Sequence, residues 1–148
     1  VGGDTAFIIP NTDTTLTIPS TSERVITVGA YDSANISTVG FSGRGYTRAT
    51  EYIKPDLVAP GVNILTTTVG ESITSFTGTS AAAPFVAGSA ALLMEWGIVD
   101  RNDIFLYGER LKAFLCNGAI RDNSREYPNR EWGYGRLCLK NTLDLLKK

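Results

Sequence analysis

The sequence predicts a layered α/β fold. Short apolar and β-branched runs separated by turn residues fill the first half of the chain, and longer runs with the length of helices fill the second half. Strands interleaved with helices in one chain pack as such layers. The 148 residues are enough for one domain with a hydrophobic core, and 43% hydrophobic and 20% charged residues are ordinary for a folded protein.

The predicted strands begin near the amino end of the chain. They cover residues 6–9, 14–18, 25–30, 37–42, 56–59 and 62–65, and residues 72–77 form one arm of a hairpin. Residues 25–30 are a continuous apolar run, as in a parallel strand that is covered on both faces. Pro10-Asn11 and Pro60-Gly61 provide turns. The polar residues 43–52 predict an exposed loop.

The first predicted helix begins near Ser80 and ends at Gly97, a suitable residue just past a helix end. Its apolar run falls short of the roughly 20 residues that cross a membrane, so we expect a buried core helix. It is apolar on nearly all sides and therefore needs cover from most directions. Further helices are predicted over residues 104–117 and 141–146, with a charged, aromatic loop over residues 121–136.

Composition excludes several classes of function. The chain has no histidine, so no Ser-His pair can form within these 148 residues. Its net charge of −1 does not indicate a positively charged surface for binding nucleic acid or a membrane. The spacing of Cys116 and Cys138 matches no zinc motif and is too sparse for a disulfide scaffold. We therefore expect no metal, and the state of the two thiols stays open.

One segment has the chemistry of a reactive site, residues 78–88. Gly78 permits a sharp turn, and Ser80 is expected where free N–H groups and the positive end of a helix dipole gather. Because proline disrupts a helix interior by about 3 kcal/mol, Pro84 is expected in the opening turn. On position alone, a helix cap is the commoner role of such a serine. The segment lacks the lysine of a phosphate-binding loop and the G-x-S-x-G elbow of the α/β-hydrolases.

The segment Gly78-Thr79-Ser80-Ala81-Ala82-Ala83-Pro84-Phe85-Val86-Ala87-Gly88 resembles the G-T-S-x-A-x-P-x-V-A-G signature of the subtilases, subtilisin-like serine proteases. Four further segments resemble motifs of this family, in the family's order. They are Ile26-Thr27-Val28-Gly29-Ala30, Phe41-Ser42-Gly43-Arg44-Gly45, Lys54-Pro55-Asp56-Leu57-Val58-Ala59-Pro60-Gly61 and Gly133-Tyr134-Gly135-Arg136-Leu137. The resemblance implies the C-terminal part of a three-layer αβα catalytic domain, with a mostly parallel sheet and a central helix that starts at the nucleophile.

The resemblance also implies roles for single residues. Ser80 is the expected nucleophile, and its N–H group the expected donor to the oxyanion. Thr79, Gly78, Thr77 and Phe76 are expected around the substrate. Leu16 and Thr17 are weaker candidates for a pocket floor. Relatives sometimes bind a structural cation at positions equivalent to Asp32 and the carbonyls of residues 19–24, although a plain solvated aspartate is the simpler interpretation.

The family's remaining catalytic residues, an Asp, a His and an oxyanion-binding Asn, are expected in upstream sequence. The resemblance thus implies a serine endopeptidase that acts on protein or peptide substrates, with this chain alone inactive. The alternatives are a pseudoprotease or regulatory binding module of the same fold, and an independently folding interaction domain, which the apolar helix disfavours because half its surface would lack cover.

A finer resemblance, carried by residues 93–99 and 102–108, is to subtilases of anaerobic spore-formers, including the germination-protease type. It implies that residues 1–13 are a linker or the return strand from an inserted β-domain, that residues 14–148 belong to the catalytic domain, and that the protein is secreted or spore-associated.

Overall fold

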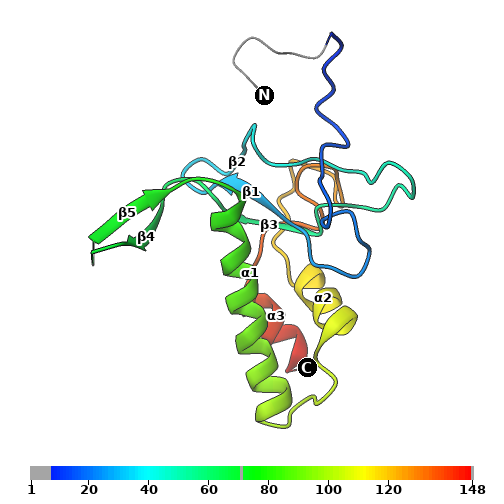
Figure 1. Ribbon diagram of the computed structural model, residues 1–148. Helices are drawn as coiled ribbons and strands as arrows, with labels where there is room; N and C mark the ends of the chain where they lie inside the picture. The colour runs from blue at the N-terminus through cyan, green and yellow to red at the C-terminus, as the bar shows by residue number, and fades with distance from the viewer. Residues whose placement is uncertain (1–7, 71, 148) are drawn as a thin grey trace.

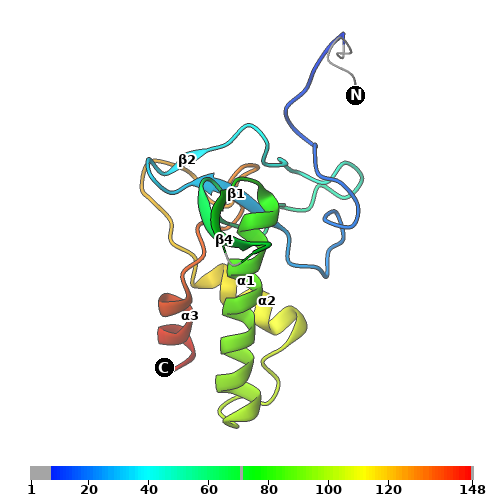
Figure 2. The ribbon, with the colours of Figure 1, turned by 60° about the vertical axis from the view of Figure 1, so that its left-hand side comes forward.

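A computed structural model describes residues 8–70 and 72–147 of the chain. Its main sheet has three strands in the order β2-β1-β3. The central strand β1 (Val28–Asp32) pairs in parallel with β3 (Leu57–Pro60). The short strand β2 (Ser37–Thr38) pairs antiparallel with the end of β1. Figure 1 shows this sheet above all three helices, and Figure 2 shows the same arrangement after rotation.

The observed strands differ from several predictions. β1 starts three residues later than predicted, and the strand predicted over residues 37–42 is reduced to β2. The strand predicted over residues 14–18 is wrong, because this segment is irregular and its first two N–H groups donate to the carbonyls of Gly45 and Arg44. Of the strand predicted over residues 6–9, the first two residues lie outside the described ones, and Ile8 and Ile9 form an exposed bend.

An antiparallel hairpin follows the sheet. Its strands β4 (Ile64–Thr68) and β5 (Ser72–Phe76) pair along their full length, from Ile64 opposite Phe76 to Thr68 opposite Ser72. The predicted hairpin arm is confirmed, whereas the strand predicted over residues 62–65 lies further along the chain. The hairpin projects from the body of the molecule in Figure 1 and is exposed almost throughout.

Helix α1 (Thr79–Met94) continues into a π turn, η1 (Glu95–Val99). Together they span 21 residues, so the expectation that this run is too short for a membrane span is wrong on length and composition. One face nevertheless packs on β1 and β3, as expected of a core helix. The buried residues of this face are Ala81, Ala82, Val86, Ser89, Leu93 and Gly97.

The outer face of α1 is apolar and exposed. Phe85 is 42% exposed and Leu92 is 54% exposed, and Val99 at the end of η1 is 72% exposed. The sheet and the other described helices therefore cover only one side of a helix that is apolar on nearly all sides. This matches the expectation that half of its surface lacks cover.

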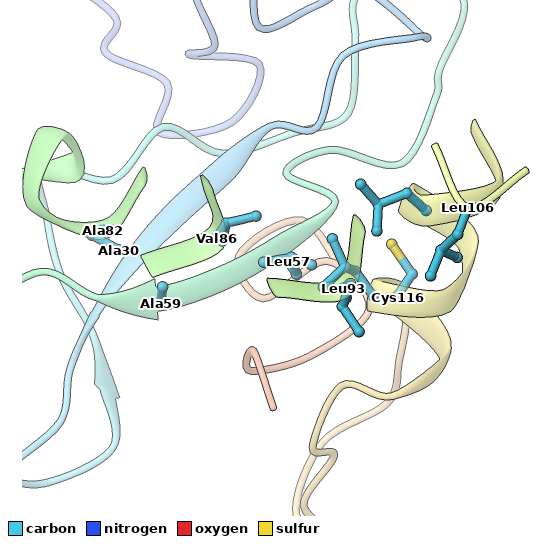
Figure 3. Close-up of a cluster of buried hydrophobic side chains, with 10 residues drawn as sticks. Ala30, Leu57, Ala59, Ala82, Val86, Leu93, Leu106 and Cys116 are labelled. Atoms are coloured by element: carbon cyan, nitrogen blue, oxygen red, sulfur yellow. The ribbon is translucent and has the colours of Figure 1, made fainter. Parts of the chain in front are cut away.

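Two shorter helices complete the fold, α2 (Gly108–Asn117) and α3 (Leu139–Leu146). α2 starts four residues later than predicted and α3 two residues earlier. The core in Figure 3 joins the sheet, α1 and α2 through a set of buried side chains. The set is Ala30, Leu57, Ala59, Ala82, Val86, Leu93, Leu106, Leu111, Leu115 and Cys116. Burial, reinforced by the charge of Asp56, raises the pKa of the Cys116 thiol to about 12.

The loops are more ordered than the sequence suggests. In the loop predicted to be exposed over residues 43–52, Thr47 is buried, and its hydroxyl accepts a hydrogen bond from the Tyr52 N–H. In the loop over residues 121–136, Trp132 is 1% exposed and packs between Tyr31 and the Arg125 guanidinium. The loop over residues 121–136 thus packs against β1 through the contact of Trp132 with Tyr31.

A buried charge cluster ties α2 to the sheet. The Asp56 carboxylate accepts hydrogen bonds from Lys54 Nζ at 2.8 Å and from the Thr27 N–H at 2.7 Å, and it lies 2.8 Å from Lys112 Nζ of α2. The same two ammonium groups donate to backbone carbonyls of the loop before β1, at Val25 and Glu23. Lys54 and Asp56 are almost fully buried. Burial lowers the pKa of Lys54, which Asp56 only partly offsets.

Candidate functional site

Ser80 lies where the carboxyl ends of the two parallel strands meet α1. The chain leaves β3 at Gly61, whose N–H donates to the Tyr31 carbonyl of β1 at 3.0 Å. Gly78, at the start of α1, donates its own N–H to the Gly61 carbonyl at 2.8 Å. Open parallel sheets in α/β proteins bind ligands at this end of the strands. The fold therefore brings Ser80 to the edge where a reactive group is expected.

The tight approach of these segments depends on Gly61. A Cβ atom at this position would lie 2.6 Å from the Cβ of Ala30 and 3.0 Å from the Gly78 oxygen. A glycine is needed here because any side chain at this position would collide with β1 and crowd the Gly78 carbonyl.

Ser80 is not the cap of its helix. Gly78 holds the N-cap position, no side chain caps the helix, and Ser80 is the second residue within it. The sequence left open that Ser80 caps the helix, and the structure excludes this cap role. The Ser80 side chain is exposed, and its hydroxyl forms no hydrogen bond with any described residue. A hydroxyl at the dipole-positive end of a helix, without a structural partner, remains available for chemistry.

Pro84 lies inside α1 and not in its opening turn, contrary to the expectation. As the sixth helical residue it has no N–H to donate to the Ser80 carbonyl, four residues earlier. The first turn of α1 is therefore held more weakly to the second than in an uninterrupted helix.

Ser80 faces an open groove of about 430 Å³ between α1 and the hairpin. The lining residues are Ile64, Leu65, Thr66, Phe76, Ser80, Ala81, Pro84 and Phe85. None of these described residues is ionisable, so the groove itself offers no proton acceptor to the hydroxyl. A general base has to come from outside the residues that line it.

Thr79 lines a second pocket, of about 590 Å³, on the side of β1. Leu16 and Thr17 line this pocket too, together with Ser42 and Gly43. The structure thus brings Leu16 and Thr17 to the same pocket as Thr79, although they do not line the groove beside Ser80. Thr79 and Ser80, which are adjacent in the helix, consequently face two different open spaces.

Thr77 and Phe76 lead from β5 into the site. The Thr77 hydroxyl accepts a hydrogen bond from the Asn63 N–H at 2.9 Å, which ties the end of β5 to the start of β4. Phe76 is 49% exposed and lines the groove beside Ser80. Gly78 and Thr79 lie between these two residues and Ser80, and the backbone of Gly78 is extended.

The groups considered for a cation are already used within the fold. An Asp32 carboxylate oxygen accepts the Ala34 N–H at 2.9 Å, as in a simple turn. The carbonyl of Pro19 accepts the Ser22 N–H, and that of Ser20 accepts the Thr27 hydroxyl. The described residues contain no cluster of three or more metal-ligating side chains.

Two residues of these pockets escaped the sequence analysis. Phe85 was quoted within the signature segment without a role, yet it lines the groove beside Ser80. Ser42 was part of a motif without a role, and its hydroxyl accepts the buried Ala30 N–H at 3.0 Å. A serine directly after an apolar residue at the end of a short strand was the available signal for Ser42.

Comparison with known proteins places these features in a family. The model of the subtilase family, peptidase S8, matches residues 2–135. The serine protease AprX of Bacillus subtilis is 32% identical over 149 aligned positions, which cover 87% of this chain and 32% of AprX. The chain therefore spans about a third of this relative.

Solved structures agree. The CspB protease of Clostridium perfringens is 50% identical with a TM-score of 0.93, and the match covers 97% of this chain and 31% of that one. The self-cleaved protease domain of PatA is 28% identical with a TM-score of 0.67, covering 88% of this chain and 44% of that one. The motifs, the fold and these similarities together show that the chain belongs to the subtilase family, of which it forms a C-terminal portion of the α/β catalytic domain.

Proposed function

We propose that the full-length protein is a serine endopeptidase and that Ser80 is its nucleophile. The observation that carries the proposal is the placement of an exposed hydroxyl, free of structural bonds, in the first turn of α1 and beside an open groove. Membership of the subtilase family supports the reaction class. The substrates are proteins or peptides.

In the proposed reaction, Ser80 Oγ attacks the carbonyl carbon of the scissile peptide while a base takes the hydroxyl proton. The Ser80 N–H is one of the first N–H groups of α1, which have no carbonyl partner within the helix, and donates to the oxyanion. The intermediate expels the amine, which receives the proton. Water then hydrolyses the acyl-enzyme by the same steps and frees Ser80.

The base is supplied from outside this chain, because the 148 residues contain no histidine. We propose that the upstream part of the same protein provides the base, its orienting carboxylate and a second oxyanion donor. Two observations support a contribution from the upstream part: the lining of the groove is uncharged, and the outer face of α1 is exposed. The chain alone is accordingly inactive.

The test is covalent labelling of the full-length protein with a fluorophosphonate. We expect one label on Ser80, none in Ser80→Ala, and wild-type labelling in Ser75→Ala, a matched control on the exposed strand β5. The 148-residue chain alone should label at least about a hundredfold more slowly, since general-base assistance contributes 10²–10⁴-fold. Persistent labelling of Ser80→Ala would contradict the assignment. A folded full-length protein that does not label at all would favour the pseudoprotease alternative.

A further inference from the structure

Strand β1 is only partly paired. On one edge it pairs with β3 from Val28 to Tyr31. On the other edge it pairs with β2 only at Tyr31 and Asp32. Among the described residues, no strand continues this edge back toward Val28, although Gly29 and Ala30 are buried. An unpaired edge of a largely buried strand is a place where a sheet continues.

A side chain occupies one position of this edge. The Ala30 N–H donates to Ser42 Oγ at 3.0 Å, and Ala30 and Ser42 are 2% and 9% exposed. Ser42 is itself held, because its N–H donates to the Val39 carbonyl at 3.1 Å. A strand added to β1 can therefore bond to the edge near Val28, but it finds the next outward N–H, that of Ala30, already taken.

The space beyond this blocked position is the pocket that Thr79 lines. Val28, Ser42, Gly43 and Thr79 all border its volume of about 590 Å³. A neighbouring strand that parts from β1 at Ala30 leaves this space open at the carboxyl end of the sheet. In open parallel sheets, ligand sites form where neighbouring strands part in this way.

We propose that Ser42 is a positioning residue for the hydrolysis: it ends strand addition to β1 at Ala30 and so fixes where the added strand leaves the sheet beside Thr79. The occupant of the edge is an extended strand from the remainder of the same protein, of which this chain spans about a third of the length in CspB. The inference rests on the proposed function, because the strand end that Ser42 fixes lies beside Thr79, the residue before the proposed nucleophile Ser80.

The experiment compares Ser42→Ala, Ser42→Thr and the control Ser37→Ala in the full-length protein. Ser37 lies on β2, and its hydroxyl donates to Asn35 Oδ1 at the exposed edge of the described residues. Steady-state hydrolysis of a casein-derived fluorescent peptide gives kcat and KM, and hydrogen exchange of the Ala30 amide gives the state of the edge. We expect kcat of Ser42→Ala to fall about tenfold with KM changed less than about twofold, since small misplacements of catalytic groups have such effects. Ser42→Thr, which keeps the hydroxyl, should recover most of the loss.

The outcomes are separable. A folded Ser42→Ala protein that loses only thermal stability, with wild-type kcat, overturns the inference and leaves the proposed function standing. Unlabelled Ser80 in the wild type overturns the proposed function, and the amide exchange still decides the edge: equal protection of Ala30 in wild type and Ser42→Ala means that a strand, and not Ser42, holds this N–H. If Ser42→Ala does not fold, Ser42→Cys replaces it, because a thiol of similar shape is a weaker acceptor.

Discussion

The buried charge cluster around Asp56 and the start of α1, which carries Ser80, both adjoin the same small sheet, yet their polar groups are satisfied differently. In the cluster, Lys54, Asp56 and Lys112 all find partners within the chain. At the start of α1, the Ser80 hydroxyl has no such partner, and the described residues that line the groove beside it carry no charge. The comparison indicates that the ionic groups of the cluster are paired within this chain, whereas the proposed nucleophile has no proton acceptor among the residues that line its groove.

The largest expected effect comes from breaking the cluster. Asp56→Asn leaves two ammonium groups without a counter-charge in a buried site, and removal of one partner of a buried ion pair costs about 3–5 kcal/mol. Urea unfolding of the full-length protein measures this loss. Ser80→Ala is the matched comparison and should change the free energy of unfolding by less than about 0.5 kcal/mol, because the side chain is exposed. Equal losses in the two variants would contradict the distinction between the two regions.

A smaller loss of stability is expected at Gly61, where the segment before Ser80 contacts the sheet. Gly61→Ala places a Cβ atom 2.6 Å from the Ala30 Cβ and against the Gly78 carbonyl. Overpacking of this kind costs about 2 kcal/mol, and we expect the rate of Ser80 labelling to fall in the same variant. Gly40→Ala is the control for stability, since a Cβ atom there meets nothing within 4 Å. Unchanged stability of Gly61→Ala would show that the turn is not fixed by this contact.

The smallest expected change in the free energy of unfolding is that of a Lys112 variant, and it depends on pH. Burial lowers the pKa of Lys112, but its hydrogen bond to Asp56 and the charge of Asp56 outweigh burial and raise the pKa above its usual 10.5. The charged Lys112 therefore stabilises the fold at and below pH 10.5, and this contribution is lost as the pH rises through the raised value. We expect Lys112→Gln to be less stable by about 1.5 kcal/mol at pH 8, with the difference narrowing above pH 10.5. A difference that stays constant up to pH 12 would exclude the ammonium as its source.

Sequence reasoning placed the start of α1 more accurately than it placed the strands of the sheet. Gly78, Thr79 and Ser80 follow a local signature, and the long apolar run that begins there predicts a helix from the sequence alone. The strand predicted over residues 14–18 failed because side-chain alternation cannot reveal whether a partner strand is present, and here the backbone bonds to Arg44 and Gly45 instead. The start of β1 shifted for a similar reason, since apolar residues continue before the first paired position.

The charge cluster was only half visible in the sequence. Lys54 and Asp56 stand two residues apart before an apolar strand, which marks them as buried ions in need of partners. Lys112 comes 56 residues after Asp56 on an amphipathic helix, where its spacing resembles that of any solvated lysine. Only the docking of α2 reveals that its ammonium group reaches the carbonyls of Glu23 and Val25.

The outer face of α1 also restricts which amino-acid substitutions the protein can accept during evolution. Ala83, Ala87 and Ala91 follow one another at four-residue intervals on the exposed side, so an element that covers the helix can approach its backbone closely. A bulkier residue in this row would force that element outward unless a smaller one appeared opposite. Substitutions on the two surfaces are thus coupled, and this row of alanines should tolerate single changes poorly even though its residues are exposed in this chain.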